Sequence, residues 1–177
     1  GEKVMVEGVP ATCGNSPTEY LAMDLRGARL AYSTTNGTRA ILTARHSERL
    51  YVGAFANLNA LIHRIVSDGV QHLTVLCSGW QGHPCIEDTL FAGALCQRLQ
   101  ATPHNDAATM AQELYTIASR QGLYDYCQKA THVHRLQRLR YDADVRFALK
   151  EDTCPVVPTL EGGVLRVKLF DITKGAF

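Results

Sequence analysis

Residues 33–39 form the stretch of this chain best suited to chemistry. Between apolar flanks the sequence reads Ser33-Thr34-Thr35-Asn36-Gly37-Thr38-Arg39. Hydroxyls and backbone N–H groups before a helix attract negative charge, because the helix dipole and the unpaired N–H groups act together. Gly37 lets the backbone approach a ligand, and Arg39 can bind two oxygens of a phosphate or sulfonate. These residue types favour an anion site, although the same run also suits an ordinary turn and helix cap.

Two adjacent carboxylates, Glu87 and Asp88, open a predicted helix. Acidic residues in a first turn complement the helix dipole, which is a sufficient structural reason for both. They can also hold a hard cation such as Mg²⁺, which binds through one or two carboxylates together with substrate oxygens. Adjacent helical residues point about 100° apart, so only one of the two easily faces a given site. Beside a phosphate-binding loop, the magnesium interpretation gains weight.

Other candidate ligands lie further along the chain. Asn57 either donates to a ligand or caps the helix that follows it. His132 and His134 are two residues apart on a predicted helix and diverge, which disfavours a joint metal site. A single histidine of this pair can donate a proton, or can simply pack with a hydrogen bond. Trp80, in a glycine-flanked loop, either covers a pocket or packs.

Predicted strands lead into the polar loops. Residues 29–32 precede the 33–39 loop, residues 50–53 precede a loop over 54–59, and residues 72–77 precede a loop over 78–84. The 72–77 run is nearly apolar throughout, which is typical of a central strand covered on both faces. Loops after the carboxyl ends of strands gather at one edge of an α/β sheet, where ligands usually bind. We therefore expect the three loops to share a site.

Apolar residues at helical spacing predict the helices. These are a short helix over 17–20 capped by Ser16, longer ones over 57–67, 86–99 and 107–122, and a helical stretch over 125–136. Two late strands are predicted over 142–149 and 164–170. The alternation of strands and helices predicts the α/β class.

The composition sets outer bounds on function. A chain of 177 residues predicts one domain over 1–177, and its 46% hydrophobic and 20% charged residues are ordinary for a globular protein. A formal net charge of +1 gives no electrostatic reason for nucleic-acid or anionic-membrane binding. No apolar run is long enough to span a bilayer, and no signal peptide is visible. Six cysteines without zinc-site spacing indicate a reducing, cytoplasmic location.

Several segments form an ordered set of motifs. They are Gly14-Asn15-Ser16-Pro17-Thr18-Glu19-Tyr20, the 33–39 loop, Gly53-Ala54-Phe55-Ala56-Asn57, Cys77-Ser78-Gly79, residues 87–94, His134-Arg135-Leu136, residues 142–145 and Val157-Pro158. In this order they resemble the 2-phosphosulfolactate phosphatase (ComB) family over essentially the whole chain. The resemblance implies a three-layer α/β/α sandwich. It also implies an Mg²⁺-dependent phosphatase that converts 2-phospho-3-sulfolactate to 3-sulfolactate, a step toward coenzyme M.

Motif positions also imply roles for individual residues. The substrate-binding set would be Asn15, Ser33, Thr34, Thr35, Asn36, Gly37, Thr38, Asn57 and Gly79. Glu87 and Asp88 would be the metal ligands. Arg39 would neutralise charge on the transferred phosphoryl group, and His134 would protonate the leaving oxygen.

One departure from the family keeps an alternative open. Family members begin with a strand and an Asp-Val-(Leu/Phe)-Arg-Ala-(Thr/Ser)-like motif that this sequence does not contain, so we expect an N-terminally incomplete chain. The alternative is a catalytically inert anion-binding or interaction module of the same fold. The expected partners are a phosphorylated small molecule and, if the protein self-associates, a second copy in a homodimer. Neither nucleic acid nor membrane is expected.

Overall fold

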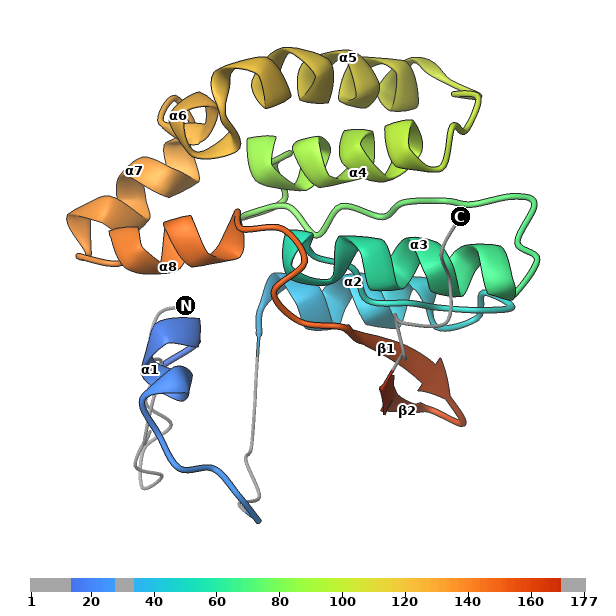
Figure 1. The fold of residues 1–177 in the computed structure, drawn as a ribbon, viewed down its shortest axis with the longest axis horizontal. Coiled ribbons are helices and arrows are strands. Elements are labelled where there is room, and N and C mark those ends of the chain that lie inside the picture. Colours follow the sequence, from blue (N-terminus) through green and yellow to red (C-terminus); the bar gives the residue numbers. More distant parts are fainter. Residues whose placement is uncertain (1–13, 28–33, 170–177) are drawn as a thin grey trace.

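The structure, a computed structural model, describes residues 14–27 and 34–169. Figure 1 shows the elements in chain order: α1 (Pro17–Leu21), α2 (Asn36–Ala44), the 3₁₀ helix η1 (Phe55–Asn57), α3 (Leu58–Ser67), α4 (Ile86–Arg98), α5 (Asp106–Gln121), α6 (Leu123–Cys127), α7 (Thr131–Arg138), α8 (Asp142–Ala148), β1 (Val156–Glu161) and β2 (Val164–Leu169). No helix in these two ranges is long and apolar enough to cross a membrane.

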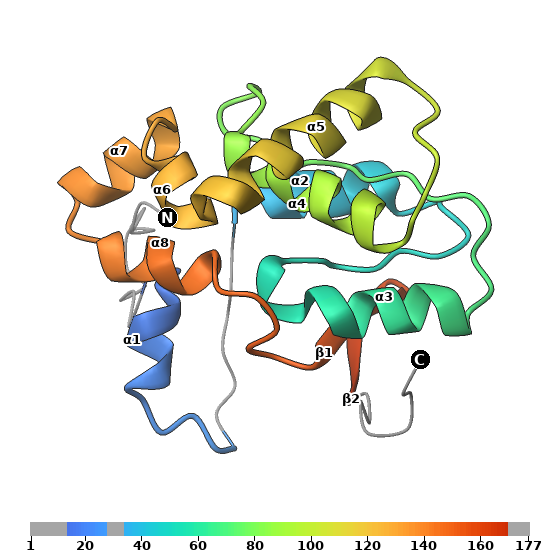
Figure 2. The same cartoon turned by 45° about the horizontal axis from the view of Figure 1, so that its top comes forward.

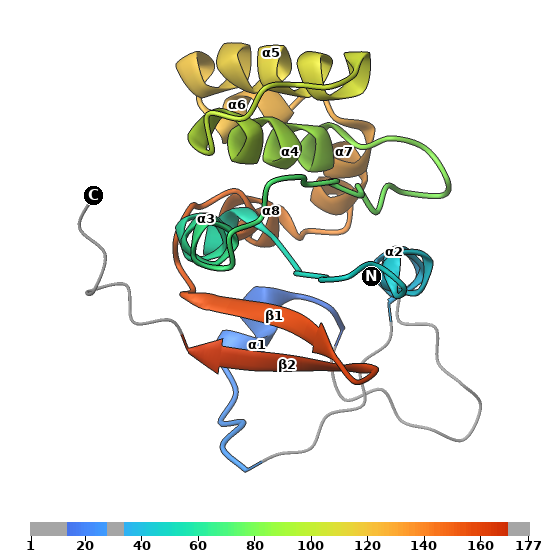
Figure 3. The same cartoon turned by 90° about the vertical axis from the view of Figure 1, so that its right-hand side faces the viewer.

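The elements lie in tiers. Figure 3 shows the β1–β2 hairpin at the base, α3 above it, and the α4–α5 pair above α3. Helices α6, α7 and α8 lie at one end of this stack, with α1 beneath α8 (Figures 1 and 2). The fold is therefore helix-rich with a small antiparallel sheet, which is compatible with an α/β fold.

The small sheet is built on β1. It pairs with β2 from Val156↔Leu169 to Glu161↔Val164, as expected for the predicted late strand over 164–170 within its described part. On the other side, Val52 N donates to the Pro158 carbonyl at 2.8 Å, and Leu160 N donates to the Leu50 carbonyl at 2.9 Å. The predicted strand at 50–53 is therefore present as a short bridge beside β1.

The helical predictions for the middle of the chain are confirmed, because their apolar stripes form the core. Leu58, Leu61 and Ile65 of α3 are buried against Leu90 of α4. Helix α4 also lies very close to α5 at Gly93, where a Cβ atom would stand 2.0 Å from the Ala111 carbonyl oxygen. A glycine at this position therefore sets the spacing of the two helices.

The predicted strand over 142–149 is wrong, because this segment forms α8. Val145 and Leu149 are both buried, and their spacing of four is that of a helix face. Asp144 is also buried: its Oδ1 accepts hydrogen bonds from Thr18 N at 3.1 Å and Thr18 Oγ1 at 2.5 Å. A contact between residues far apart in the chain thus fixes α8 against α1.

The expected central strand over 72–77 is also wrong. This segment runs as an irregular connection between α3 and α4 (Figure 1), and no other described residue pairs with its backbone. Its side chains are exposed, including Leu73, Val75 and Leu76. The described residues thus contain no doubly covered parallel sheet, and the expected three-layer sandwich is not confirmed. The strand predicted over 29–32 lies outside the described residues.

Candidate functional site

The loop between residue 77 and α4 is a tight hairpin that requires glycine. Trp80 and His83 exchange two backbone hydrogen bonds, each of 3.0 Å. Gly79 has φ +64°, and a Cβ atom there would lie 2.5 Å from the His83 carbonyl oxygen. Backbone conformation and space both exclude a larger residue. Gly79 therefore fixes the direction in which Trp80 leaves the hairpin.

Asp88 ties this hairpin to the start of α4. Its Oδ2 accepts a 2.7 Å hydrogen bond from Gly79 N and a longer one, 3.4 Å, from Ser78 Oγ. Of the predicted site residues, Gly79 and Asp88 are thus in direct contact. Part of the Asp88 carboxylate is consequently used to hold the loop.

Glu87 is in a different state. Its Oε2 atom is buried and has no hydrogen-bond partner, and the only other such side-chain atom among the described residues is His132 Nδ1 on α7. Burial lowers the pKa of His132, although the nearby Glu87 carboxylate acts in the opposite direction. The two unpaired atoms therefore belong to one neighbourhood. Buried polar atoms without partners are rare in folded proteins and call for a missing ligand, ion or water.

Trp80 brings α7 into the same neighbourhood. Its ring centroid lies 5.3 Å from that of His132 and 5.6 Å from Arg135 Cζ. His132 and Arg135 are three residues apart and share one face of α7. We call Trp80, Glu87, Asp88, His132 and Arg135 the α4–α7 cluster. The sequence offers His132 only as one of two histidines that could donate a proton, and neither His132 nor Arg135 is in the set of site residues that the motif positions imply.

A thiol beside the cluster is unsuited to nucleophilic chemistry. Burial, with the charges of Glu87 and Asp88, raises the pKa of Cys85 to about 12. The thiolate is the nucleophilic form of cysteine, and it is scarce at neutral pH with such a pKa. The cluster therefore favours binding and charge neutralisation over a cysteine-based covalent step.

The predicted anion loop lies at the start of α2. Ser33 is outside the described residues. Thr34 Oγ1 accepts a 3.0 Å hydrogen bond from Thr38 N in the first turn of α2, whereas the N-cap residue Thr35 forms no cap bond with its side chain. Asn36 and Gly37 form the first residues of the helix, and Thr35 is exposed.

Arg39 is exposed on the first turn of α2, and no described residue forms a hydrogen bond or ion pair with its guanidinium group. Helix α2 buries none of its residues. The described contacts therefore leave this loop open to solvent, and none of them connects Arg39 to the α4–α7 cluster.

The side chain of Asn57 has a structural role, because it links three backbone segments. The side chain is buried; its Nδ2 donates to the carbonyls of Val52 at 3.1 Å and Val156 at 2.7 Å, and its Oδ1 accepts from Ala54 N at 2.8 Å. Both amide hydrogens are thus committed to the backbone, where they join η1 to β1.

For two other predicted residues, no described hydrogen bond or ring contact reaches the cluster. His134 is exposed, and its Nε2 contacts the Gln128 carbonyl rather than Glu87 or Asp88. Asn15 precedes Ser16, whose Oγ caps α1 by accepting from Glu19 N at 3.2 Å. The structure therefore places His132, not His134, beside the acidic pair.

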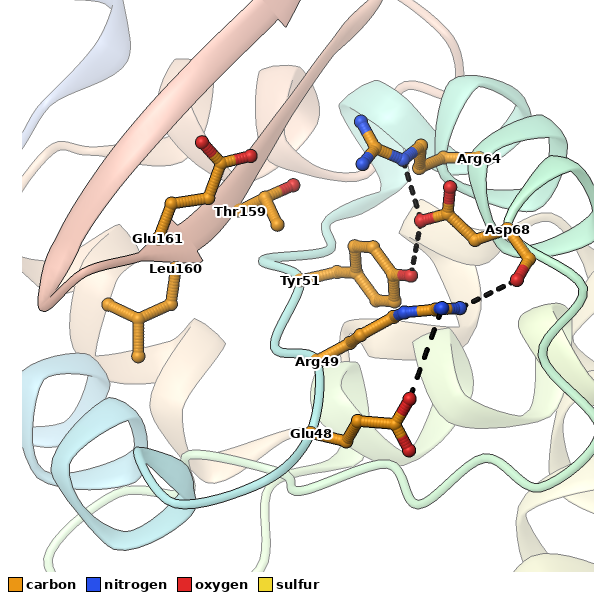
Figure 4. A pocket seen from close by; sticks show the side chains of 8 residues that line it. All are labelled: Glu48, Arg49, Tyr51, Arg64, Asp68, Thr159, Leu160 and Glu161. Carbon is orange, nitrogen blue, oxygen red and sulfur yellow. Dashed lines mark hydrogen bonds and ion pairs between the residues drawn. The ribbon is translucent and has the colours of Figure 1, made fainter.

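A separate hollow of about 350 Å³ lies between α3 and the sheet (Figure 4). Asp68 at its edge accepts from Tyr51 Oη at 2.6 Å and Arg64 Nε at 2.7 Å, and its carbonyl accepts from Arg49 Nη1 at 2.6 Å. These charges satisfy one another. Side chains that line the hollow thus form a structural hydrogen-bond network, and none of the lining residues is a predicted site residue.

The α4–α7 cluster can be tested for its fit to Mg²⁺. No group of three or more His, Cys, Asp or Glu side chains among the described residues could enclose a metal ion. Mg²⁺ usually keeps several waters and needs only one or two carboxylates when it also binds substrate phosphate. The unpaired Glu87 Oε2 fits such a ligand, and Asp88 lies beside it in sequence. The residues fit an ion shared with the substrate.

Comparisons with known proteins agree on one family over most of the chain. A family model described as 2-phosphosulpholactate phosphatase matches residues 2–163. Proteins named "Probable 2-phosphosulfolactate phosphatase" are similar to the chain, including those of Caldanaerobacter subterraneus subsp. tengcongensis (30% identical), Thermotoga petrophila (34%) and Synechococcus sp. strain CC9605 (38%). The matches cover 86%, 89% and 92% of this chain and 64%, 67% and 69% of the respective relatives. The chain thus spans about two thirds of the length of these relatives.

Proposed function

The chain belongs to the 2-phosphosulpholactate phosphatase family, and we propose on that premise that it takes part in the hydrolysis of a small anionic phosphate monoester. The proposed substrate is 2-phospho-3-sulfolactate, and the products are 3-sulfolactate and phosphate, a step toward coenzyme M. The observation that carries the proposal within this chain is the buried, unpaired Glu87 Oε2 at the start of α4.

The proposed cofactor is Mg²⁺, held by Glu87 with Asp88 beside it. When bound, Mg²⁺ would neutralise charge on the phosphoryl oxygens. The chain's own residues have two further proposed tasks. Asp88 holds Gly79 in place, so that the hairpin keeps its shape around the ligand. Arg39 and the N–H groups at the start of α2 bind anionic oxygens.

We propose a histidine of α7 as the proton donor to the leaving oxygen, and two residues are candidates. His134 was expected in this role, but its Nε2 faces the Gln128 carbonyl. His132 lies beside Glu87 and Trp80 and is better placed to contact a ligand there. Comparing the variants His132→Asn and His134→Asn assigns the role to whichever substitution lowers kcat.

Further properties of the whole protein are proposed on the same family basis. They are a three-layer α/β/α arrangement, a cytoplasmic location and a homodimeric assembly. No interaction with nucleic acid or membrane is proposed.

Phosphate release from phosphosulfolactate tests the function. The purified chain is assayed with Mg²⁺, with EDTA, and with EDTA followed by excess Mg²⁺. We expect turnover that EDTA abolishes and Mg²⁺ restores. Phosphate binding without turnover under all three conditions would contradict the phosphatase proposal and support the inert anion-binding module. The absence of a three-residue metal group among the described side chains is the observation that keeps this alternative in the test.

A further inference from the structure

We propose that Arg135, oriented by Trp80, is a specificity-determining residue that binds a second anionic group of the substrate, a sulfonate or carboxylate next to the phosphate ester. This inference rests on the proposed function. It concerns a cation on α7, far in sequence from the residues assigned to the phosphoryl group. With this role for Arg135, the α4–α7 cluster would bind substrates that carry two or more anionic groups.

The first argument is the packing of α7 on the hairpin. Arg135 Cζ lies 5.6 Å from the Trp80 ring centroid, within the range of a cation–π contact. The His132 ring lies 5.3 Å from the same centroid. An arginine stacked on an aromatic ring loses less freedom when it binds an anion, because its planar group is already oriented. Trp80 is itself fixed by its two hydrogen bonds to His83.

The second argument is the pair of unpaired buried atoms. Neither Glu87 Oε2 on α4 nor His132 Nδ1 on α7 has a hydrogen-bond partner among the described residues, and the His132 ring lies against Trp80. A polar ligand lying there would meet a carboxylate on α4 and an imidazole on α7. Two separate elements, close enough for the charge of Glu87 to act on His132, therefore each carry a buried hydrogen-bonding atom that no described residue satisfies.

The third argument is charge. The α4 side of the cluster carries the carboxylates Glu87 and Asp88, and these alone would repel an anionic ligand. Mg²⁺ can offset this for the phosphoryl group only. A second anion needs a cation of its own, and Arg135 supplies one close enough to His132 that its charge lowers the pKa of that imidazole.

A comparison of substrates tests the assignment. Arg135→Gln and Arg135→Lys are assayed with phosphosulfolactate and with p-nitrophenyl phosphate, which has no second anionic group. For Arg135→Gln we expect KM for phosphosulfolactate to rise about tenfold or more, and to rise far more than KM for p-nitrophenyl phosphate. Arg135→Lys should recover part of the loss. Arg138→Gln, an exposed arginine on the same helix, is the matched control. Equal effects on both substrates, or no effect on either, would overturn the inference.

A binding measurement separates this inference from the proposed function. Sulfoacetate, which carries a sulfonate and a carboxylate but no phosphate, is titrated into the wild-type chain and into Arg135→Gln by calorimetry. We expect the variant to bind sulfoacetate at least about tenfold more weakly. Equal affinity would refute the role of Arg135 even in an active phosphatase. Selective loss of binding in a chain without turnover would support Arg135 while the phosphatase proposal fails. Thermal unfolding of each variant verifies that it is folded.

Discussion

Gly79 N donates a 2.7 Å hydrogen bond to Asp88 Oδ2, and this bond joins the hairpin after residue 77 to the first turn of α4. The acidic side chain is therefore an acceptor that shapes the loop as well as a candidate ligand. Gly79 can make the bond because its backbone has φ +64°. The position of Trp80, and through it the contact with α7, depends on this arrangement.

Replacing Gly79 should disturb the hairpin more than replacing its neighbour Gly82. Both have positive φ, but a Cβ atom at Gly79 would lie 2.5 Å from the His83 carbonyl oxygen, whereas nothing lies within 4 Å at Gly82. We expect Gly82→Ala to lower the free energy of unfolding by about 1 kcal/mol and Gly79→Ala by about 2–4 kcal/mol. Urea unfolding measures both. Equal losses would contradict the steric argument.

Asn57→Ala should act on stability rather than on substrate binding. The change leaves Ala54 N and the carbonyls of Val52 and Val156 without their side-chain partner. We expect the free energy of unfolding to fall by about 2–4 kcal/mol, with KM unchanged in the folded fraction. Asn59→Ala, at an exposed position, is the control. A raised KM with wild-type stability would instead show that Asn57 contributes to ligand binding.

The Asp144 carboxylate should make the stability of the α1–α8 contact depend on acid pH. Burial opposes its ionisation, but hydrogen bonds from Thr18 and Ser16 outweigh that effect and lower the pKa of Asp144 below 3.8. A depressed pKa in the folded state contributes stability that is complete above the unfolded pKa and is lost as pH falls through the folded pKa. Asp144→Asn should therefore cost about 1–2 kcal/mol at neutral pH and progressively less as the pH falls below 3.8. Parallel unfolding curves for the two proteins across this pH range would rule out the contribution.

Sequence patterns predicted the central helices because their apolar stripes are local. Leu58, Leu61 and Ile65 repeat at helical spacing, so the segment itself carries the signal that it forms a helix with one apolar face. The run at 72–77 does not form the predicted strand. An apolar pattern indicates that a segment can be buried, but it does not show that neighbouring strands are present to pair with it. The segment at 142–149 forms a helix whose apolar signal is short, with only Val145 and Leu149 buried at a spacing of four, and its packing against α1 depends on the bond from Thr18 to Asp144, which the local sequence does not reveal.

The candidate site was predicted in part for a similar reason. Gly79 and the acidic pair lie within ten residues of each other, so their proximity follows from a loop leading into a helix. The choice between His132 and His134 depended on which face α7 presents. The sequence suggested one helical stretch over 125–136, but the structure ends α6 at Cys127 and gives Ala130 an extended conformation before α7. This break sets the orientation of α7, and it places His132 and Arg135 against Trp80.

The central claim is that the Glu87 carboxylate, whose buried Oε2 has no partner among the described residues, binds Mg²⁺ for phosphate release. It is tested most directly by the Mg²⁺ dependence of phosphate release in wild type, Glu87→Gln and Glu113→Gln, the last an exposed glutamate on α5. We predict that Glu87→Gln lowers kcat/KM by about 100-fold or more and needs higher Mg²⁺ for half-maximal rate, while Glu113→Gln behaves as wild type. A Glu87→Gln variant with wild-type turnover and an unchanged Mg²⁺ requirement would contradict the claim.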